Sequence, residues 1–476
     1  MAYDSSAPIL SLENQQQKLR QLRHDVLARH RPSLQGQTNA LRAMAQIINE
    51  LEQECRKNQI SESVMRAEIV NRTVGDVNLR LVSECESDTD DRKDYRRLAD
   101  ELGVALPGEQ LHGYTANGET YSWLRERMVE NERLLLAHNF DPRVYDVYSL
   151  GNPLLRAWLA QEMQRWGLPV SEQQVYLGLG SMDCLDKVLR GLAQLSRSQN
   201  LPVGAILFPA PSFSFPEWSA LANGYRFHPV STHPENHFKL TGEQLEQILQ
   251  SAPDIRLIYL IVNNNPTAFS YTPDDLQAIH AVLQRYQERG RDIFLLADLA
   301  YIGTGKPEDD QARLAAFSTP DAFQRSIFIS SFSKTYTLTG ERFGWLSCGN
   351  PQITASLPIV WANTYVSLPG DWQLRFMAYY QLFQARPWLV EKLRAFYRYR
   401  RTQFLKQLQR LNEQFSLFEK IYLDDDTTIY NWSKLCAGED VFSVFEKTGI
   451  AGVPGSGFGY TNEYVRFSVG VAPCTN

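Results

Sequence analysis

From about residue 150, short runs of consecutive apolar residues alternate with segments that have helical spacing. A short run that is apolar at every position is typical of a strand buried on both faces. Strands that alternate with helices favour a mainly parallel sheet covered by helices, which is an α/β fold. The predicted strands cover residues 205–208, 256–262, 293–297, 326–329 and 345–348.

Two threonines mark predicted helix starts between these strands. Thr241 and Gln244 fit a capping box, in which each side chain binds the other residue's backbone N–H group. Thr272 precedes Pro273, and proline is favoured at the first position of a helix. We therefore expect one helix to begin directly after each threonine.

The segments on either side of this pattern differ from it. Residues 1–105 have helical spacing at Leu19 and Val26, and again at Met44 and Leu51, followed by a charge-dense stretch at 84–97. We interpret residues 1–105 as a helical N-terminal extension that forms an interface. Residues 106–150, with a predicted helix at 123–136, are an N-terminal arm and part of a small domain.

The remaining chain is predicted to form a large domain (151–355) and a C-terminal small domain (356–476). The C-terminal segment has α+β character. It contains a long predicted helix at 387–411, short strands at 417–422 and 429–432, a helix at 441–446 and a last strand at 465–469.

Composition excludes several classes of protein. A chain of 476 residues is too long for one core, and its net charge of -6 gives no reason to expect nucleic acid or an anionic membrane as partner. No apolar run is long enough to span a bilayer, and the N-terminus lacks a signal-peptide pattern. The six cysteines are scattered without metal-ligand spacing, so we expect reduced thiols, no metal and a cytoplasmic location.

Ligands of open α/β sheets bind beyond the C-terminal ends of the strands, so residues there are candidates for a site. Gly180, Ser181 and Met182 precede a predicted helix, whose free N–H groups would attract an anion, although a plain turn needs glycine too. Asn265 follows the run 256–262 and could equally belong to a polar turn.

Two further runs end in ionisable residues. Asp298, with Tyr301 after it, ends the run 293–297; a buried carboxylate needs a partner, and a helix N-cap is the alternative. Ser331 and Lys334 follow the run 326–329, and Arg342 comes eight residues later. Lysine taken alone is more often a surface residue. Near other cations, however, its pKa falls and its amine becomes nucleophilic towards carbonyl groups, and the arginine fork suits phosphate.

Taken together, these candidates meet the requirements of pyridoxal 5'-phosphate (PLP). That cofactor needs an anion cradle for its phosphate, an amine for its aldehyde, and a carboxylate that keeps the pyridine nitrogen protonated. It also needs donors to its phenolic oxygen, and each requirement has a candidate in this chain.

From about residue 110 onwards, the chain resembles the class I/II aminotransferases, which are fold-type I PLP enzymes. The resemblance implies that Lys334 forms a Schiff base with PLP and that Ser331 and Arg342 bind its phosphate. It also implies a homodimer with shared active sites, and amino acid and keto acid substrates. The remaining implied contacts are backbone N–H groups of Gly180, Ser181 and Met182 to phosphate, Asp298 to the pyridine nitrogen, Tyr301 and Asn265 to the phenolic oxygen, Phe213 stacked on the ring, and Arg466 to the substrate carboxylate.

Some questions stay open at this level. Ala268 stands where the family usually has glycine, so we expect this turn to differ a little. Either Tyr145 or Tyr148 matches the tyrosine that reaches a neighbouring subunit. A PLP-dependent lyase, decarboxylase or synthase would use the same residues, and an aminotransferase-like regulator would need a basic N-terminal region that this chain lacks.

Overall fold

The computed structural model describes residues 11–30, 40–77, 114–138, 140–146, 149–422 and 427–471. The chain divides into two compact units. We call Met1–Gly75, Arg400–Leu423 and Tyr430–Asn476 the small unit, and Asp76–Tyr399 with Asp424–Ile429 the large unit. These boundaries differ from those of the four segments expected from sequence, and that finer division stays a prediction.

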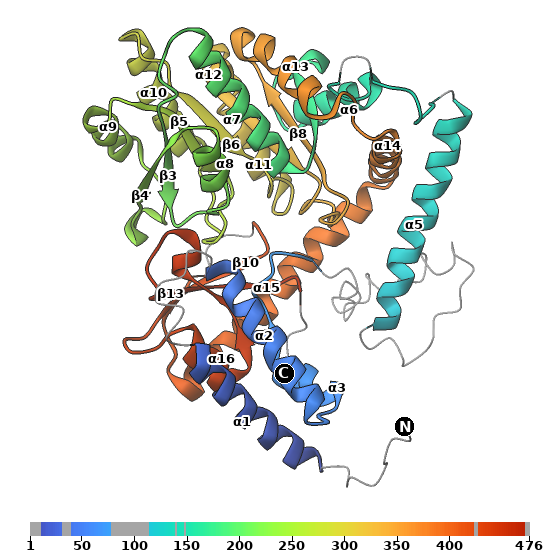
Figure 1. Cartoon of the computed structure of the whole chain (residues 1–476), viewed down its shortest axis with the longest axis vertical. Coiled ribbons are helices and arrows are strands. Elements are labelled where there is room, and N and C mark those ends of the chain that lie inside the picture. The colour runs from blue at the N-terminus through green and yellow to red at the C-terminus, as the bar shows by residue number, and fades with distance from the viewer. Residues whose placement is uncertain are drawn as a thin grey trace. The chain divides into compact units, whose positions relative to one another are not determined.

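The large unit is built on a seven-stranded sheet in the order β2-β8-β7-β6-β5-β3-β4 (Figure 1). Strand β8 runs antiparallel to both of its neighbours, and all other neighbouring pairs are parallel. The predicted, mainly parallel α/β sheet is therefore confirmed. The strands are β2 (Val175–Leu179), β3 (Ala205–Ala210), β4 (Arg226–Ser231), β5 (Ile255–Ile261), β6 (Phe294–Asp298), β7 (Ser326–Ser331) and β8 (Phe343–Cys348).

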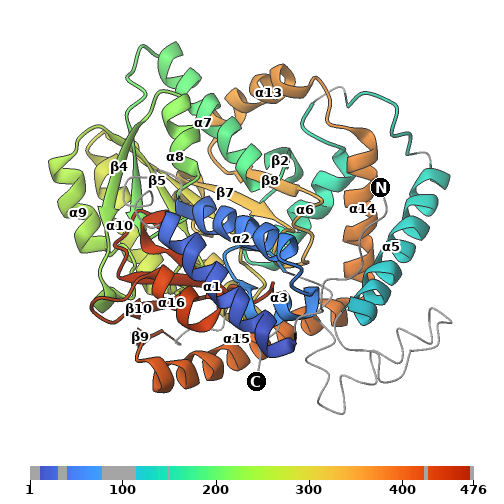
Figure 2. The ribbon, with the colours of Figure 1, turned by 60° about the horizontal axis from the view of Figure 1, so that its bottom comes forward.

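Helices cover this sheet. Helix α7 packs against β2, β7 and β8, and α8 and α13 lie beside it (Figure 2). The helices of the large unit are α5 (Tyr114–Ala137), α6 (Pro153–Arg165), α7 (Ser181–Ser198), α8 (Pro216–Ala222), α9 (Gly242–Ser251), α10 (Pro273–Glu288), α11 (Pro307–Ala315), α12 (Pro320–Arg325), α13 (Pro351–Tyr365), α14 (Gly370–Ala385) and the first part of α15 (Pro387–Phe415). Two short 3-10 turns cover Glu172–Gln174 and Pro234–Asn236.

Both predicted helix starts occur, with one difference in detail. Thr272 and Asp275 bind each other's backbone N–H groups, and Pro273 is the first residue of α10. Thr241 accepts the N–H of Gln244 at 3.1 Å. The capping box predicted there is wrong in its second half, because the Gln244 amide instead donates to the Ser231 carbonyl at 2.9 Å.

The small unit combines the N-terminal helices with the end of the chain. Its antiparallel sheet has the order β12-β13-β10-β9, and a separate parallel pair joins β1 to β11. Helix α1 packs against α2, α3 and α16 (Figure 1). Helix α2 also packs against β12. Its elements are α1 (Leu12–His30), α2 (Ala40–Lys57), α3 (Glu62–Glu68), β1 (Val70–Asn71), the end of α15, β9 (Phe418–Ile421), β10 (Tyr430–Leu435), α16 (Val441–Thr448), β11 (Ile450–Ala451), β12 (Val453–Pro454), the 3-10 turn Gly455–Phe458 and β13 (Tyr464–Ser468).

The helical spacing seen near the N-terminus marks a buried face. Leu19, Val26, Met44 and Leu51 are all at most 1% exposed. These helices therefore belong to the core of the small unit, since their apolar faces are fully removed from water. The charged stretch at 84–97 lies outside the described residues.

Candidate active site

The candidate residues of the large unit lie where strands of its sheet end. Asp298 is the last residue of β6, Ser331 is the last residue of β7, and Asn265 lies in the loop after β5. Because β5, β6 and β7 are parallel neighbours, these three ends share one edge of the sheet. Lys334 follows Ser331 in a turn and is half-buried.

Asp298 is held by two donors. Its Oδ2 atom accepts a hydrogen bond from the Tyr259 hydroxyl at 2.6 Å, and its Oδ1 atom accepts the backbone N–H of Ala300 at 2.9 Å. Asp298 is 8% exposed, and burial raises the pKa of its carboxyl group, while both hydrogen bonds oppose that rise. No helix starts at Asp298, so it is not an N-cap. A buried carboxylate at this edge suits a cationic partner.

The turn that carries Lys334 is anchored through its backbone. The Lys334 carbonyl accepts a hydrogen bond from the Tyr397 hydroxyl at 2.5 Å. Tyr397 lies on α15 and is 1% exposed. This contact fixes the main chain from which the Lys334 side chain extends.

A candidate anion cradle lies where α7 begins. Gly180 is the N-cap of α7 and has a φ of 87°, so its left-handed backbone favours glycine. A Cβ atom at Gly180 would lie 2.9 Å from Cζ of Arg342, and a Cβ atom at Gly344 would lie 2.7 Å from Cα of Gly180. The guanidinium of Arg342 therefore lies directly against the start of α7, and Ser181 and Met182 form the first turn of that helix.

Ser331 offers a further donor. Its side chain is 5% exposed, and its Oγ atom has no hydrogen-bond partner among the residues that the structure describes. Buried hydroxyl groups in folded proteins are normally hydrogen-bonded, so an orphaned one at a strand end is a sign of a ligand. Together with Arg342 and the N-terminus of α7, this hydroxyl fits the phosphate group of PLP.

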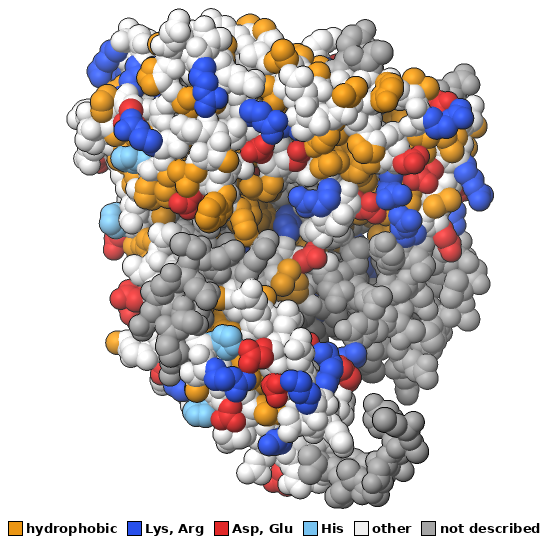
Figure 3. Space-filling model, viewed as in Figure 1, with side chains coloured by type: hydrophobic (Ala, Val, Ile, Leu, Met, Phe, Trp, Pro, Cys, Tyr) orange, Lys and Arg blue, Asp and Glu red, His pale blue; other side chains and the backbone are white. Residues whose placement is uncertain are grey.

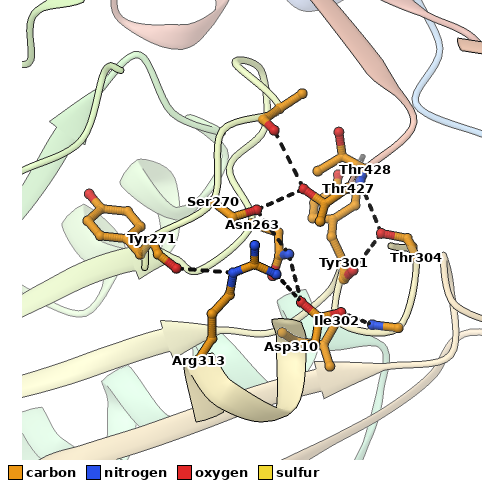
Figure 4. Close-up of polar contacts among 12 residues, drawn as sticks. Asn263, Ser270, Tyr271, Tyr301, Ile302, Thr304, Asp310, Arg313, Thr427 and Thr428 are labelled. Carbon is orange, nitrogen blue, oxygen red and sulfur yellow. Dashed lines mark hydrogen bonds and ion pairs between the residues drawn. The ribbon is translucent and has the colours of Figure 1, made fainter. Parts of the chain in front are cut away.

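Tyr301 and Asn265, which are 6% and 3% exposed, lie on two loops joined by a buried carboxylate. Figure 4 shows this carboxylate, Asp310, with Tyr301 nearby. Asp310 is fully buried on α11. Its Oδ2 atom accepts the backbone N–H of Gly303 at 2.7 Å, and its Oδ1 atom accepts the Asn263 amide at 3.1 Å and Arg313 at 2.8 Å. Burial raises the pKa of Asp310, and these donors oppose the rise.

The same network extends into the loop after β5. The Ser270 hydroxyl binds the Asn263 amide at 3.2 Å and Thr427 at 2.8 Å, as Figure 4 shows. Ala268 has a φ of 62°, so its backbone lies in the left-handed region that glycine adopts most easily. The loop imposes this left-handed backbone on Ala268 at an energetic cost, and the expected difference from the family's turn stays a prediction.

Phe213 lies in the segment after β3 and is half-buried. Its ring centroid is 5.1 Å from that of Phe215, with an interplanar angle of 51°. The ring is thus partly accessible. Of the two candidate tyrosines, Tyr145 is 75% exposed and Tyr148 lies outside the described residues.

Arg466 belongs to the small unit and is described within it. It lies on β13 between β12 and β10 and is 3% exposed. Its guanidinium lies 4.3 Å from the ring centroid of Tyr430 and 5.0 Å from that of Phe458, and it donates to the Thr73 carbonyl at 2.5 Å. Two aromatic faces therefore fix the arginine fork.

Three residues of this region were not singled out from the sequence alone. Tyr259 is the one hydroxyl inside the apolar run of β5, and Asp310 is one of several acids at the start of α11, where a solvated helix end is the ordinary interpretation. Lys187 is 0% exposed and binds Asp183 at 2.7 Å, with its Nζ atom 3.6 Å from the Tyr365 ring centroid. Its four-residue spacing from Asp183 was the available signal.

Comparisons with known proteins identify the family of this chain. The sequence model of the family "Aminotransferase class I and II" matches residues 150–476, and the chain belongs to that family. It is 27% identical over 296 residues to aromatic-amino-acid aminotransferase 2 of Thermococcus litoralis, which covers 60% of this chain and 69% of that protein. It is also 27% identical over 289 residues to the LL-diaminopimelate aminotransferase of Maridesulfovibrio salexigens, covering 59% and 69% of the two chains.

Solved structures show the same fold. An aspartate aminotransferase from Thermus thermophilus, solved with maleate, superposes with a TM-score of 0.64 at 20% identity, covering 93% of this chain and 95% of that one. Within the part of the chain that the structure describes, no helix is long and apolar enough to cross a membrane. Nor do three or more His, Cys, Asp or Glu residues there form a group that could hold a metal ion.

Proposed function

We propose that this chain is a PLP-dependent aminotransferase that moves an amino group between an amino acid and a 2-keto acid. The observation that carries the proposal is the shared sheet edge at which Asp298, Ser331 and Lys334 follow adjacent strands. PLP, when bound, supplies an electron sink that stabilises negative charge on the α-carbon of an amino acid.

The residues of the large unit divide the binding task. Ser331, Arg342 and the N–H groups at Gly180, Ser181 and Met182 would hold the phosphate. Asp298 would hold the proton on the pyridine nitrogen, because a buried carboxylate is stabilised by an adjacent positive charge. Tyr301 and Asn265 would donate to the phenolic oxygen, and Phe213 would cover the ring.

Lys334 would both hold the cofactor and transfer the α-proton of the substrate. Its amine would hold the cofactor aldehyde at rest, and when free it would accept the proton from the α-carbon of the substrate as a general base. Arg466 would bind the substrate carboxylate through its two parallel N–H groups. The substrate side chain is a separate question, since the relatives act on aromatic amino acids and on LL-diaminopimelate.

Lys334→Ala tests this proposal, with Lys306→Ala as an exposed control. The native protein should take up PLP with a visible absorbance band from the Lys334 linkage, and should form keto acid and new amino acid in equal amounts. Lys334→Ala should lose the band and nearly all turnover, while Lys306→Ala should keep both. A Lys334→Ala protein with native transaminase turnover contradicts the proposal, and release of CO₂ or ammonia without amine transfer favours a decarboxylase or lyase.

We also propose a homodimer, and the support is an exposed apolar surface on the large unit. Val144, Tyr145, Leu154 and Val366 are 68%, 75%, 49% and 65% exposed. The segment of Val144 and Tyr145 is joined to that of Val366, because the Asp146 N–H donates to Ser367 Oγ at 2.9 Å. Figure 3 shows hydrophobic side chains on this face in the region of α6 and α13. Sedimentation of native protein and Val366→Asp tests the assembly, and a monomeric native protein contradicts it.

The thiols agree with a reducing compartment. Cys55, Cys184 and Cys348 are free and buried, and burial raises the pKa of Cys55 to about 11. Inert thiols of this kind suit the cytoplasm, which is the location we propose.

A further inference from the structure

Tyr259 is a buried tyrosine in the middle of β5 whose hydroxyl group donates to Oδ2 of Asp298 at 2.6 Å. The side chain is 0% exposed, and its ring lies 5.3 Å from that of Phe208 on the neighbouring strand β3. The ring therefore has little freedom to move, and the hydroxyl position is set by the packing of the sheet.

The two donors to Asp298 act on different oxygens. Tyr259 binds Oδ2 and the backbone N–H of Ala300 binds Oδ1. A carboxylate held through both oxygens has a fixed plane, and its remaining lone pairs point in fixed directions. Such support lets a buried side chain hold a ligand in one geometry.

The hydrogen bond from Tyr259 also affects whether the Asp298 carboxyl group is ionised. Asp298 loses hydration on burial, which favours its neutral form, and a hydroxyl donor favours the ionised form. The two groups that oppose this effect of burial are the Tyr259 hydroxyl and the backbone N–H of Ala300. Among the residues that the structure describes, Tyr259 is therefore the side chain whose hydrogen bond supports this charge.

We propose that Tyr259 is a positioning residue that keeps the Asp298 carboxylate oriented and ionised for the protonated ring nitrogen of the cofactor. This inference rests on the proposed function. Tyr259 has no contact with the substrate in this proposal. Its effect comes from the hydroxyl group that binds Asp298, and not from the ring. The alternative is that the hydroxyl only satisfies a buried carboxylate and stabilises the fold.

Tyr259→Phe removes only the hydroxyl and separates these roles. The matched control is Tyr225→Phe, because Tyr225 is 4% exposed and its hydroxyl donates to the Leu189 carbonyl, at 3.1 Å. The dissociation constant of each protein is measured for PLP and for an analogue in which a C–H group replaces the pyridine nitrogen. Thermal unfolding of each protein without cofactor records any general loss of stability.

Tyr259→Phe should weaken PLP binding by about tenfold, which is the scale of one hydrogen bond to a charged group. It should leave binding of the carbon analogue within about twofold of native, because the analogue has no ring proton to pair with Asp298. In an Asp298→Asn background the same substitution should have no further effect on PLP binding. Tyr225→Phe should bind both compounds as the native protein does.

Equal weakening for both compounds assigns Tyr259 a purely structural role and overturns the inference, as does unchanged PLP binding. These results leave the proposed function intact, provided that native protein binds PLP through Lys334. Native protein that fails to bind PLP overturns the proposed function and this inference together.

Discussion

The Oδ2 atom of Asp310 accepts the backbone N–H of Gly303 at 2.7 Å, two residues after Tyr301. The other oxygen of the same carboxylate accepts the side-chain amide of Asn263, two residues before Asn265. One buried carboxylate therefore joins the two loops that carry the candidate partners of the phenolic oxygen. All its described partners are donors, so the site requires an ionised acid.

Asp310→Asn should destabilise the protein by about 3 kcal/mol. The substitution places an NH₂ group against donors and leaves the Arg313 charge uncompensated in a site where it is 8% exposed. Urea unfolding measures the loss of unfolding free energy. Asp309→Asn is the control, because Asp309 is adjacent to Asp310 in the chain but exposed. Equal unfolding midpoints for the two variants would show that the Asp310 contacts do not stabilise the protein.

The sequence could predict the parts of the site that follow from strand ends, but not the contacts between distant side chains. Asp298, Ser331 and Asn265 could be found because each follows an apolar run, and parallel strands bring such ends together. Strand β4 was missed because it is an exposed edge strand without a continuous apolar run, and β2 because it was read only as the approach to the glycine turn. The Asp310 contacts could not be predicted, since sequence spacing does not give the direction of a side chain.

The same limit applies to the small unit. Helical spacing predicted α1 and α2 and their buried faces. It could not show that α1 packs against α16, because these helices are separated by most of the chain. Nor could it show whether a loop would hold Ala268 in left-handed backbone, which is decided by the contacts around the loop.

Ala268→Gly should stabilise the protein by about 1 kcal/mol. Ala268 has a φ of 62°, and left-handed backbone costs residues with a Cβ about 1–2 kcal/mol, part of which is offset by the methyl group that is buried there. Ala278→Gly is the control of opposite sign, because Ala278 lies exposed in the interior of α10, where glycine costs about 1 kcal/mol. Urea denaturation measures the free energy of unfolding of both variants. A lower value for Ala268→Gly than for native protein would contradict backbone strain at this turn.

His280 should make the protein sensitive to acid. It is 7% exposed on α10, neither ring nitrogen has a hydrogen-bond partner among the described residues, and burial, with a smaller effect of Arg325, lowers its pKa to about 4. The unfolded chain takes up this proton first as the pH falls, so stability is complete above about pH 6.5 and declines towards pH 4. At pH 5 the loss from this residue should be about 2 kcal/mol.

His280→Leu tests that source of acid sensitivity. The variant should lose less stability than native protein when the pH is lowered from 7 to 5, and the difference between the two losses should be about 2 kcal/mol. His233→Gln, at an exposed position, should follow the native curve. Urea midpoints at both pH values give the comparison, and parallel curves for His280→Leu and native protein would exclude His280 as the cause.

Gly180→Ala should damage the anion cradle selectively. A Cβ atom at this position would collide with the Arg342 guanidinium, and its φ of 87° disfavours any residue other than glycine. If phosphate lies between Arg342 and the start of α7, the variant should bind PLP at least about tenfold more weakly, a loss equivalent to about 1.4 kcal/mol. Its affinity for pyridoxal, which lacks the phosphate, should change far less.

Gly340→Ala is the matched control, because a Cβ atom there meets nothing within 4 Å and the position is exposed. It lies on the same loop as Arg342, so it should keep native affinity for both compounds. The ratio of PLP to pyridoxal affinity isolates the phosphate contribution from any change in the rest of the site. An unchanged ratio in Gly180→Ala would mean that the phosphate is held elsewhere, and the positively charged side chain of Arg342 would then need another role.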